Sequence, residues 1–255
     1  MLPHRRFSSD PGACLNTTTY VPSDDFRSTD RGPDTNSQQS SKPLPLYPTD
    51  AVVYAGPELK KYCLFASQLI SNSTFFFEKF NSPYNPSRKY YPVITLPEVD
   101  SGTFTAFKHS MFSQRLARWE DWDLYYPSPR TASLSGTPYR RQARILDFYI
   151  FAHDYGCKSF KQHVLKEAHG YYTETSPWYR DVKRAWEKLP SDDPLLTLLV
   201  DSQVETWPDR DEVEESPEDV EAVPKEFLWR VMRRFREVRT MGLESAIRRR
   251  EEYDR

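Results

Sequence analysis

The stretch AVVYAGPELKKYCLFASQLISNSTFFF, residues 51–77, decides the fold. Two short runs of β-branched and aromatic residues, 51–54 and 62–65, stand on either side of Gly56-Pro57. Runs of this kind, separated by a glycine and a proline, predict a β-hairpin. Because the chain continues from the hairpin into helical patterns, we expect a mixed α+β fold.

The residues after the hairpin predict a small sheet with helices packed against it. Two short helical turns are expected over 69–77, where apolar residues flank a polar Ser-Asn-Ser. A third strand is expected at 93–96, where Pro97 ends it. Asp100 or Ser101 suits the N-cap of the next helix. Apolar residues then recur on one helical face: Phe104, Phe107 and Met111.

Helical patterns continue through the C-terminal half of the chain. One helix is expected from about residue 140, closed by Gly156 as its C′ residue. Another is expected from about residue 159. Two further apolar patterns, at 178–189 and 194–200, each fit one helix.

Three segments have a biased composition. Residues 1–48 are poor in apolar side chains and are expected to be a disordered tail, since they cannot bury enough surface to offset chain entropy. Residues 205–221 hold nine acids and one arginine and predict a solvated linker. Residues 225–255 hold ten Lys or Arg and six Asp or Glu, and they predict an amphipathic helix with an arginine-rich face.

Several segments, in this order, resemble the BTB/POZ family. YCLFASQL (62–69) resembles the family's hairpin and the segment after it, and SNSTFF (71–76) resembles its Ser-x-Phe-Phe helix. ITLPEVD (94–100) resembles the stretch that leads into its central helix, and LDFYIFAHDYG (146–156) resembles its Leu-Tyr-rich helix. Two more are similar to the C-terminal region of the short fungal BTB proteins: PLLTLLVD (194–201) and PKEFL (224–228).

The resemblance implies an α+β BTB/POZ fold, a small sheet with helices around it, followed by a helical C-terminal extension. Together with the composition it divides the chain into five parts: a disordered tail (1–48), a BTB/POZ domain (49–172), a helical extension (173–204), an acidic linker (205–223) and an arginine-rich helix (224–255).

The resemblance also implies a binding module without catalytic activity, whose partners are other proteins or a second copy of itself. A first alternative is a substrate adaptor of a cullin-based ubiquitin ligase. Cullin-binding members carry a hydrophobic-x-Glu element after the Phe-Phe helix, whereas the loop between Phe80 and Tyr91 holds no acid, which argues against this alternative. A second alternative is a nucleic-acid-associated regulator that uses the basic C-terminal helix.

The composition argues against several classes of partner and indicates the cellular compartment. The net charge of −2 is not that of a basic nucleic-acid binder. No apolar run is long enough to span a membrane, and no membrane partner is expected. Three widely spaced cysteines fit an intracellular chain, cytoplasmic or nuclear. No phosphate-binding loop, dinucleotide fingerprint or zinc-protease motif occurs, so no cofactor is expected.

Two groups of residues are candidates for an interaction site. Aromatic residues in the loop expected at 117–138 could be exposed and form an interface: Trp119, Trp122, Tyr125 and Tyr126. Arginines near the C-terminus could form a basic patch: Arg230, Arg233, Arg234, Arg248, Arg249 and Arg250.

Two weaker patterns have ordinary structural explanations. His153 and Cys157 have a spacing that is compatible with zinc binding, but the further ligands that a zinc site needs do not follow at the usual spacing. We therefore expect these two residues to lie at the end of a helix and not in a zinc site. The acids at 120–123 could serve acid–base chemistry, but a solvated loop is expected instead. No catalytic residue and no metal site is therefore expected.

Overall fold

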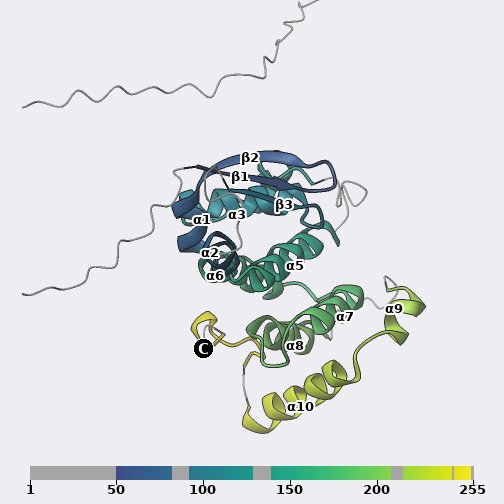
Figure 1. Ribbon diagram of the computed structural model, residues 1–255. Helices are drawn as coiled ribbons and strands as arrows, with labels where there is room; N and C mark the ends of the chain where they lie inside the picture. The colour runs from purple at the N-terminus through teal and green to yellow at the C-terminus, as the bar shows by residue number, and fades with distance from the viewer. Residues whose placement is uncertain (1–49, 82–91, 129–138, 208–214, 243, 254–255) are drawn as a thin grey trace, which may run out of the picture. The chain divides into compact units, whose positions relative to one another are not determined.

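The computed structural model describes residues 50–81, 92–128, 139–207, 215–242 and 244–253. These residues form a mixed α+β structure in which helices predominate over a small sheet (Figure 1). The expected α+β class is thereby confirmed. The tail expected at 1–48 lies outside the described residues.

The sheet contains strands β1 (Asp50–Ala55), β2 (Lys60–Phe65) and β3 (Val93–Leu96), in the order β2-β1-β3. Strands β1 and β2 form the expected antiparallel hairpin, and β3 pairs with β1 in parallel. Gly56 makes the turn after β1 with a φ of 84°, a conformation that glycine adopts without strain. The inward side chains of β1, Ala51, Val53 and Ala55, are completely buried.

Helix α3 (Ser101–Ser113) packs against the inner face of this sheet (Figure 1). The carboxylate of Asp100 accepts a hydrogen bond from the backbone N–H of Thr103, which confirms the expected N-cap. The ring of Tyr62 on β2 lies 4.7 Å from that of Phe104, and its hydroxyl donates to the carbonyl of Ser101. On the predicted apolar face of this helix, Phe104 therefore meets the sheet, while Phe107 packs against rings from other helices.

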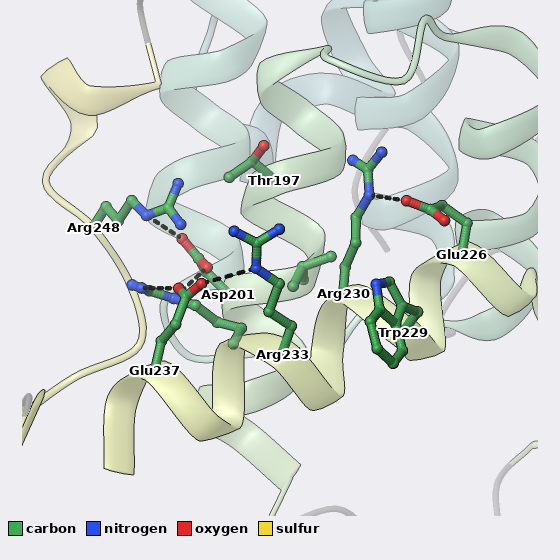
Figure 2. A pocket seen from close by; sticks show the side chains of 10 residues that line it. Thr197, Asp201, Glu226, Trp229, Arg230, Arg233, Glu237 and Arg248 are labelled. Atoms are coloured by element: carbon green, nitrogen blue, oxygen red, sulfur yellow. Dashed lines mark hydrogen bonds and ion pairs between the residues drawn. The ribbon is translucent and has the colours of Figure 1, made fainter. Parts of the chain in front are cut away.

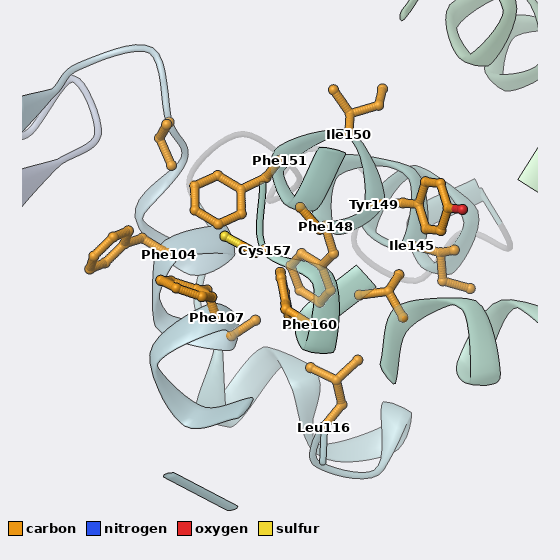
Figure 3. Packing of buried hydrophobic residues seen from close by; sticks show 14 of the residues in the cluster. Phe104, Phe107, Leu116, Ile145, Phe148, Tyr149, Ile150, Phe151, Cys157 and Phe160 are labelled. Carbon is orange, nitrogen blue, oxygen red and sulfur yellow. The ribbon is translucent and has the colours of Figure 1, made fainter. Parts of the chain in front are cut away.

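Two further pairs of helices surround the aromatic core. The two short helices expected after the hairpin are present as α1 (Ala66–Asn72) and α2 (Thr74–Asn81). The expected helix pair is α5 (Tyr139–Asp154) and α6 (Lys158–Tyr172). Phenylalanines from α2, α3, α5 and α6 meet in one buried cluster: Phe76, Phe104, Phe107, Phe148, Phe151 and Phe160. Figure 3 shows all of these except Phe76 with labels.

The remaining helices are α7 (Tyr179–Lys188), α8 (Pro194–Thr206), α9 (Pro217–Glu221) and α10 (Lys225–Met241). Buried apolar residues from these helices and from the C-terminal segment form a second cluster: Tyr179, Val182, Val200, Val204, Val223, Phe227, Val231 and Ala246. Helices α7 and α8 stand where the sequence predicts them. None of the described helices combines the length and the apolar character that crossing a bilayer requires.

The C-terminal part contains one helical turn more than expected, and its last helix is shorter than expected. The linker expected at 205–223 is helical over 217–221, because Ser216 caps this turn and the acids 218 and 219 favour a helix N-terminus. The helix expected over 224–255 ends at Met241, because Gly242 adopts a left-handed φ of 61° and donates to the carbonyl of Val238. Residues 208–214 lie outside the described part of the chain.

The turn between α5 and α6 locks onto the start of α2. Gly156 closes α5 as predicted, with a φ of 61°. The carbonyl of the preceding Tyr155 accepts a hydrogen bond from the hydroxyl of Ser73. A Cβ atom placed on Gly156 would lie 1.8 Å from Oγ1 of Thr74. This position therefore needs both the left-handed backbone and the missing side chain of glycine.

We predict that Gly156→Ala lowers the free energy of unfolding by about 2 kcal/mol, from left-handed strain and the clash with Thr74. The control is Gly170→Ala on the exposed side of α6, where a Cβ meets nothing within 4 Å. That variant should gain about 0.5–1 kcal/mol. Urea unfolding followed by circular dichroism measures both, and equal stabilities for the two variants would contradict this account of the turn.

Candidate protein-interaction surface

The aromatic segment around residues 119–126 is a pair of short helical turns, Trp119–Asp121 and α4 (Trp122–Tyr125), rather than the expected loop. Trp122 and Tyr126 are buried, so their predicted exposure is wrong. Because they are four residues apart on a helical turn, both point inward. The indole N–H of Trp122 donates to the carbonyl of Ala117, and the hydroxyl of Tyr126 accepts from the N–H of the same residue.

Trp119 and Tyr125 face outward, as predicted, and are about half exposed. The guanidinium of Arg141 lies between the rings of Trp119 and Tyr171, at 4.8 and 4.6 Å from their centroids. Trp119 is thus held in a cation–π stack rather than standing free. The structure therefore splits the predicted aromatic surface into two core residues and two outer ones.

The weaker candidates have structural roles. Asp123 forms ion pairs with Arg140 and Arg144, at 2.6 and 2.9 Å. Cys157 is buried at the start of α6, where burial raises the pKa of its thiol to about 12. Among the described residues, no group of three or more His, Cys, Asp or Glu is arranged to hold a metal ion.

The predicted basic patch is divided between two elements. Arg230, Arg233 and Arg234 lie on α10, whereas the arginines 248–250 lie in the C-terminal segment beyond it. Between α8, α10 and this segment is a recess of about 350 Å³ (Figure 2). Its walls carry both charges and one exposed aromatic ring: Thr197, Val200, Asp201, Glu226, Trp229, Arg230, Arg233, Arg234, Glu237 and Arg248.

Asp201, at the floor of this recess, is completely buried on α8. Its carboxylate lies 2.9 Å from Nε of Arg234 and 3.4 Å from Nε of Arg248. It also accepts a hydrogen bond of 2.7 Å from the hydroxyl of Tyr253. Burial raises the pKa of Asp201, whereas the hydrogen bond from Tyr253 and the two arginines act in the opposite direction. These contacts make Asp201 the hub that joins α8, α10 and the C-terminal segment.

Sequence reasoning missed this hub, although a signal for it exists. Asp201 directly follows the apolar run 195–200 on a helix expected to be buried. A carboxylate in such a place needs a cationic partner, and the arginine-rich segment after residue 225 is the nearest source. Arg234 is accordingly buried, which corrects its predicted place on an exposed basic surface.

The other arginines of the recess also have carboxylate partners. Arg230 pairs with Glu226 at 2.8 Å, and Arg233 pairs with Glu237 at 3.2 Å (Figure 2). A surface that grips a phosphate backbone needs cations that are not already neutralised by neighbouring acids. The recess is thus a mixed-charge surface rather than a row of uncompensated positive charges.

The outer face of α10 is the most exposed apolar surface next to this recess. Leu228, Trp229 and Met232 are 42%, 62% and 65% exposed, while Phe227 and Val231 on the opposite side are buried. One turn further on, the exposed Arg233 and Arg236 continue the same face. We refer to Leu228, Trp229, Met232, Arg233 and Arg236 as the α10 face.

The structure is therefore that of a mixed α+β protein. It carries a recess lined by paired charges and one aromatic ring, and the exposed apolar α10 face lies next to this recess. No protein-family model matches the chain, and a search of curated proteins finds no similar sequence.

Proposed function

We propose that this chain is a non-catalytic protein-interaction module of the BTB/POZ type, and that the α10 face is its partner-binding surface. The element order supports the BTB/POZ assignment: a hairpin, two short helices, a third strand, a helix and a helix pair. The observation that carries the binding role is the exposure of Trp229 and Met232 next to arginines. Trp, Met and Arg are the residue types in which protein interfaces are enriched.

The chemistry of the α10 face specifies a kind of partner. Leu228, Trp229 and Met232 offer apolar contact, and methionine adapts to different partner shapes. Arg233 and Arg236 are exposed on the same side of the helix. A second copy would bring its own Arg236 against this one, whereas Arg233 is already paired with Glu237. The surface therefore fits a partner protein that presents apolar side chains with carboxylates around them.

The two alternative roles receive less support. The arginines that line the recess are paired with acids, which leaves the nucleic-acid role without an uncompensated basic surface there. The segment between Phe80 and Tyr91, on which the cullin-adaptor role depends, lies outside the described residues apart from Asn81. Self-association remains a prediction of the family resemblance.

The test is proximity labelling with a biotin ligase fused to the full chain, in cells that naturally make the protein. We expect Trp229→Ser/Met232→Ser to lose the main labelled proteins by at least tenfold. Because both side chains are exposed, the free energy of unfolding should change by less than about 1 kcal/mol.

The control for this test is Leu124→Ser, which removes an apolar side chain that is 75% exposed on α4. The control should label the same proteins as the wild type. If the double variant and the wild type label the same proteins to the same extent, the proposed role of the α10 face is wrong. A cullin that is lost from the labelled set only in the double variant would identify an adaptor.

A further inference from the structure

The segment 244–253, which we call the C-terminal strap, lies across α6, α8 and α10 in the way that a bound peptide would. Apart from the short turn Arg250–Glu252, it is not helical. Side chains of three different helices hold its backbone. Glu205 accepts from the N–H of Ala246 at 2.6 Å, Arg234 donates to the carbonyl of Ala246 at 2.7 Å, and His169 donates to the carbonyl of Arg248 at 3.1 Å.

Two side chains of the strap converge on the same carboxylate. Arg248 lies 3.4 Å from Asp201, and the hydroxyl of Tyr253, five residues later, donates to Asp201 at 2.7 Å. The same hydroxyl accepts from the backbone N–H of Arg248 at 3.1 Å, which fixes the spacing between the two anchors. The ring of Tyr253 is buried, with its centroid 5.7 Å from that of His169.

The strap is attached through polar groups and through a few apolar ones. Ala246 belongs to the second apolar cluster, and Tyr253 belongs to the main core cluster, against which Ile247 packs. Helix α10 is held by Phe227 and Val231, which belong to an apolar cluster. The strap buries only a small alanine, Ala246, and the tyrosine, with Ile247 partly covered. Because only Ala246 and Tyr253 of the strap are fully buried, its release would uncover little of the two apolar clusters, and local opening of this kind costs less than global unfolding. Beside Arg248 the recess of about 350 Å³ remains uncovered, so the groove has room for a ligand longer than the strap.

From these contacts we propose that the groove formed by α6, α8 and α10 is a peptide-binding site which the strap occupies in cis. Its preferred ligand is a partner-protein peptide with a small residue two positions before an arginine and a tyrosine five positions after it. Asp201 would bind the arginine and the tyrosine hydroxyl of the peptide, and Glu205 and Arg234 would form hydrogen bonds with its backbone. The covalent tether gives the strap a high effective concentration, so a partner peptide binds only when the strap has left. The recess beside Arg248 shares Trp229 and Arg233 with the α10 face, but the contacts given above for the strap involve neither residue, so this site does not depend on the role of that face.

The first test uses a chain that can be cut after it has folded. A protease recognition sequence is inserted after Gly242, so that the strap is present during folding and is then severed. The probe is a fluorescent peptide with the sequence of residues 244–253, ESAIRRREEY. We expect anisotropy to show saturable binding to the cut protein and binding at least 100-fold weaker to the uncut protein.

Peptide variants test the chemistry of the site. A peptide with Tyr253→Phe should bind at least tenfold more weakly, since it loses a hydrogen bond to a buried carboxylate. A peptide with Glu251→Gln should bind like the parent, because Glu251 is exposed. The proposal fails if the cut protein stays folded but binds no peptide, or if it binds the Tyr253→Phe and parent peptides equally.

A second measurement keeps the proposal testable if the cut chain unfolds. In the intact chain, hydrogen exchange should show that the amides of Ala246 and Arg248 open locally, faster than those of α5. Tyr253→Phe should speed strap exchange at least tenfold and leave α5 unchanged. If strap and α5 amides accelerate together, the strap is an integral part of the fold, and the groove is not a binding site.

Discussion

Replacing Arg234 with alanine is expected to lower the free energy of unfolding by about 3–5 kcal/mol, the range for breaking a buried ion pair by removing one partner. Asp201 is completely buried and would keep only Arg248 and Tyr253 as partners. The lost guanidinium also donates to the carbonyl of Ala246, so the attachment of the C-terminal strap weakens at the same time.

The neighbouring arginine is the matched control for this prediction. Arg233 is 73% exposed and makes only a surface ion pair with Glu237. Arg233→Ala should therefore change the free energy of unfolding by about 0.5 kcal/mol or less. Chemical denaturation at neutral pH measures both variants. If Arg234→Ala is no less stable than Arg233→Ala, Asp201 is not the hub of this part of the fold.

Replacing Phe107 with alanine should be equally severe, at about 3–5 kcal/mol. Phe107 is completely buried at the centre of the aromatic cluster (Figure 3). Its ring lies within 6.4 Å, centroid to centroid, of four others: Phe76, Phe104, Phe151 and Phe160. These rings come from α2, α3, α5 and α6. The cavity left by the missing Phe107 ring would therefore weaken the packing between several helices at once.

Phe112, on the same helix, provides the matched control. It is the same residue type but is 52% exposed, so Phe112→Ala should cost less than about 1 kcal/mol. Thermal unfolding followed by circular dichroism separates the two variants. A similar loss of stability in both would mean that the cluster is not the main source of stability for α3.

The parts of the fold that the sequence predicts are those where a local pattern and the buried face agree. On α3, the cap at Asp100 and the apolar repeat through Phe107 both act within a few residues of chain. The hairpin is similar, because Gly56 sets the turn and alternate residues of β1 face the core. In these elements, short-range chemistry is sufficient.

The parts that the sequence does not predict depend on contacts between distant residues. Trp122 and Tyr126 are buried because Phe148 and His109, far along the chain, cover them. Asp201 gains its role from Arg234, Arg248 and Tyr253, of which Tyr253 is 52 residues away. No local pattern contains these pairings. Arg234 departs from the predicted basic patch for this reason: an arginine's partners, not its own position, decide whether its charge faces solvent.

The mass of the complex that the tagged full chain forms in extracts of its own cells tests the central claim most directly. Size-exclusion chromatography with light scattering compares the wild type with Trp229→Ser/Met232→Ser. We predict that the wild type elutes in a complex whose mass is well above the 30.0 kDa of one chain. The complex that contains the double variant should have a lower mass. A wild-type chain that travels alone, or a double variant that keeps the full complex, would contradict a protein-interaction role for the α10 face.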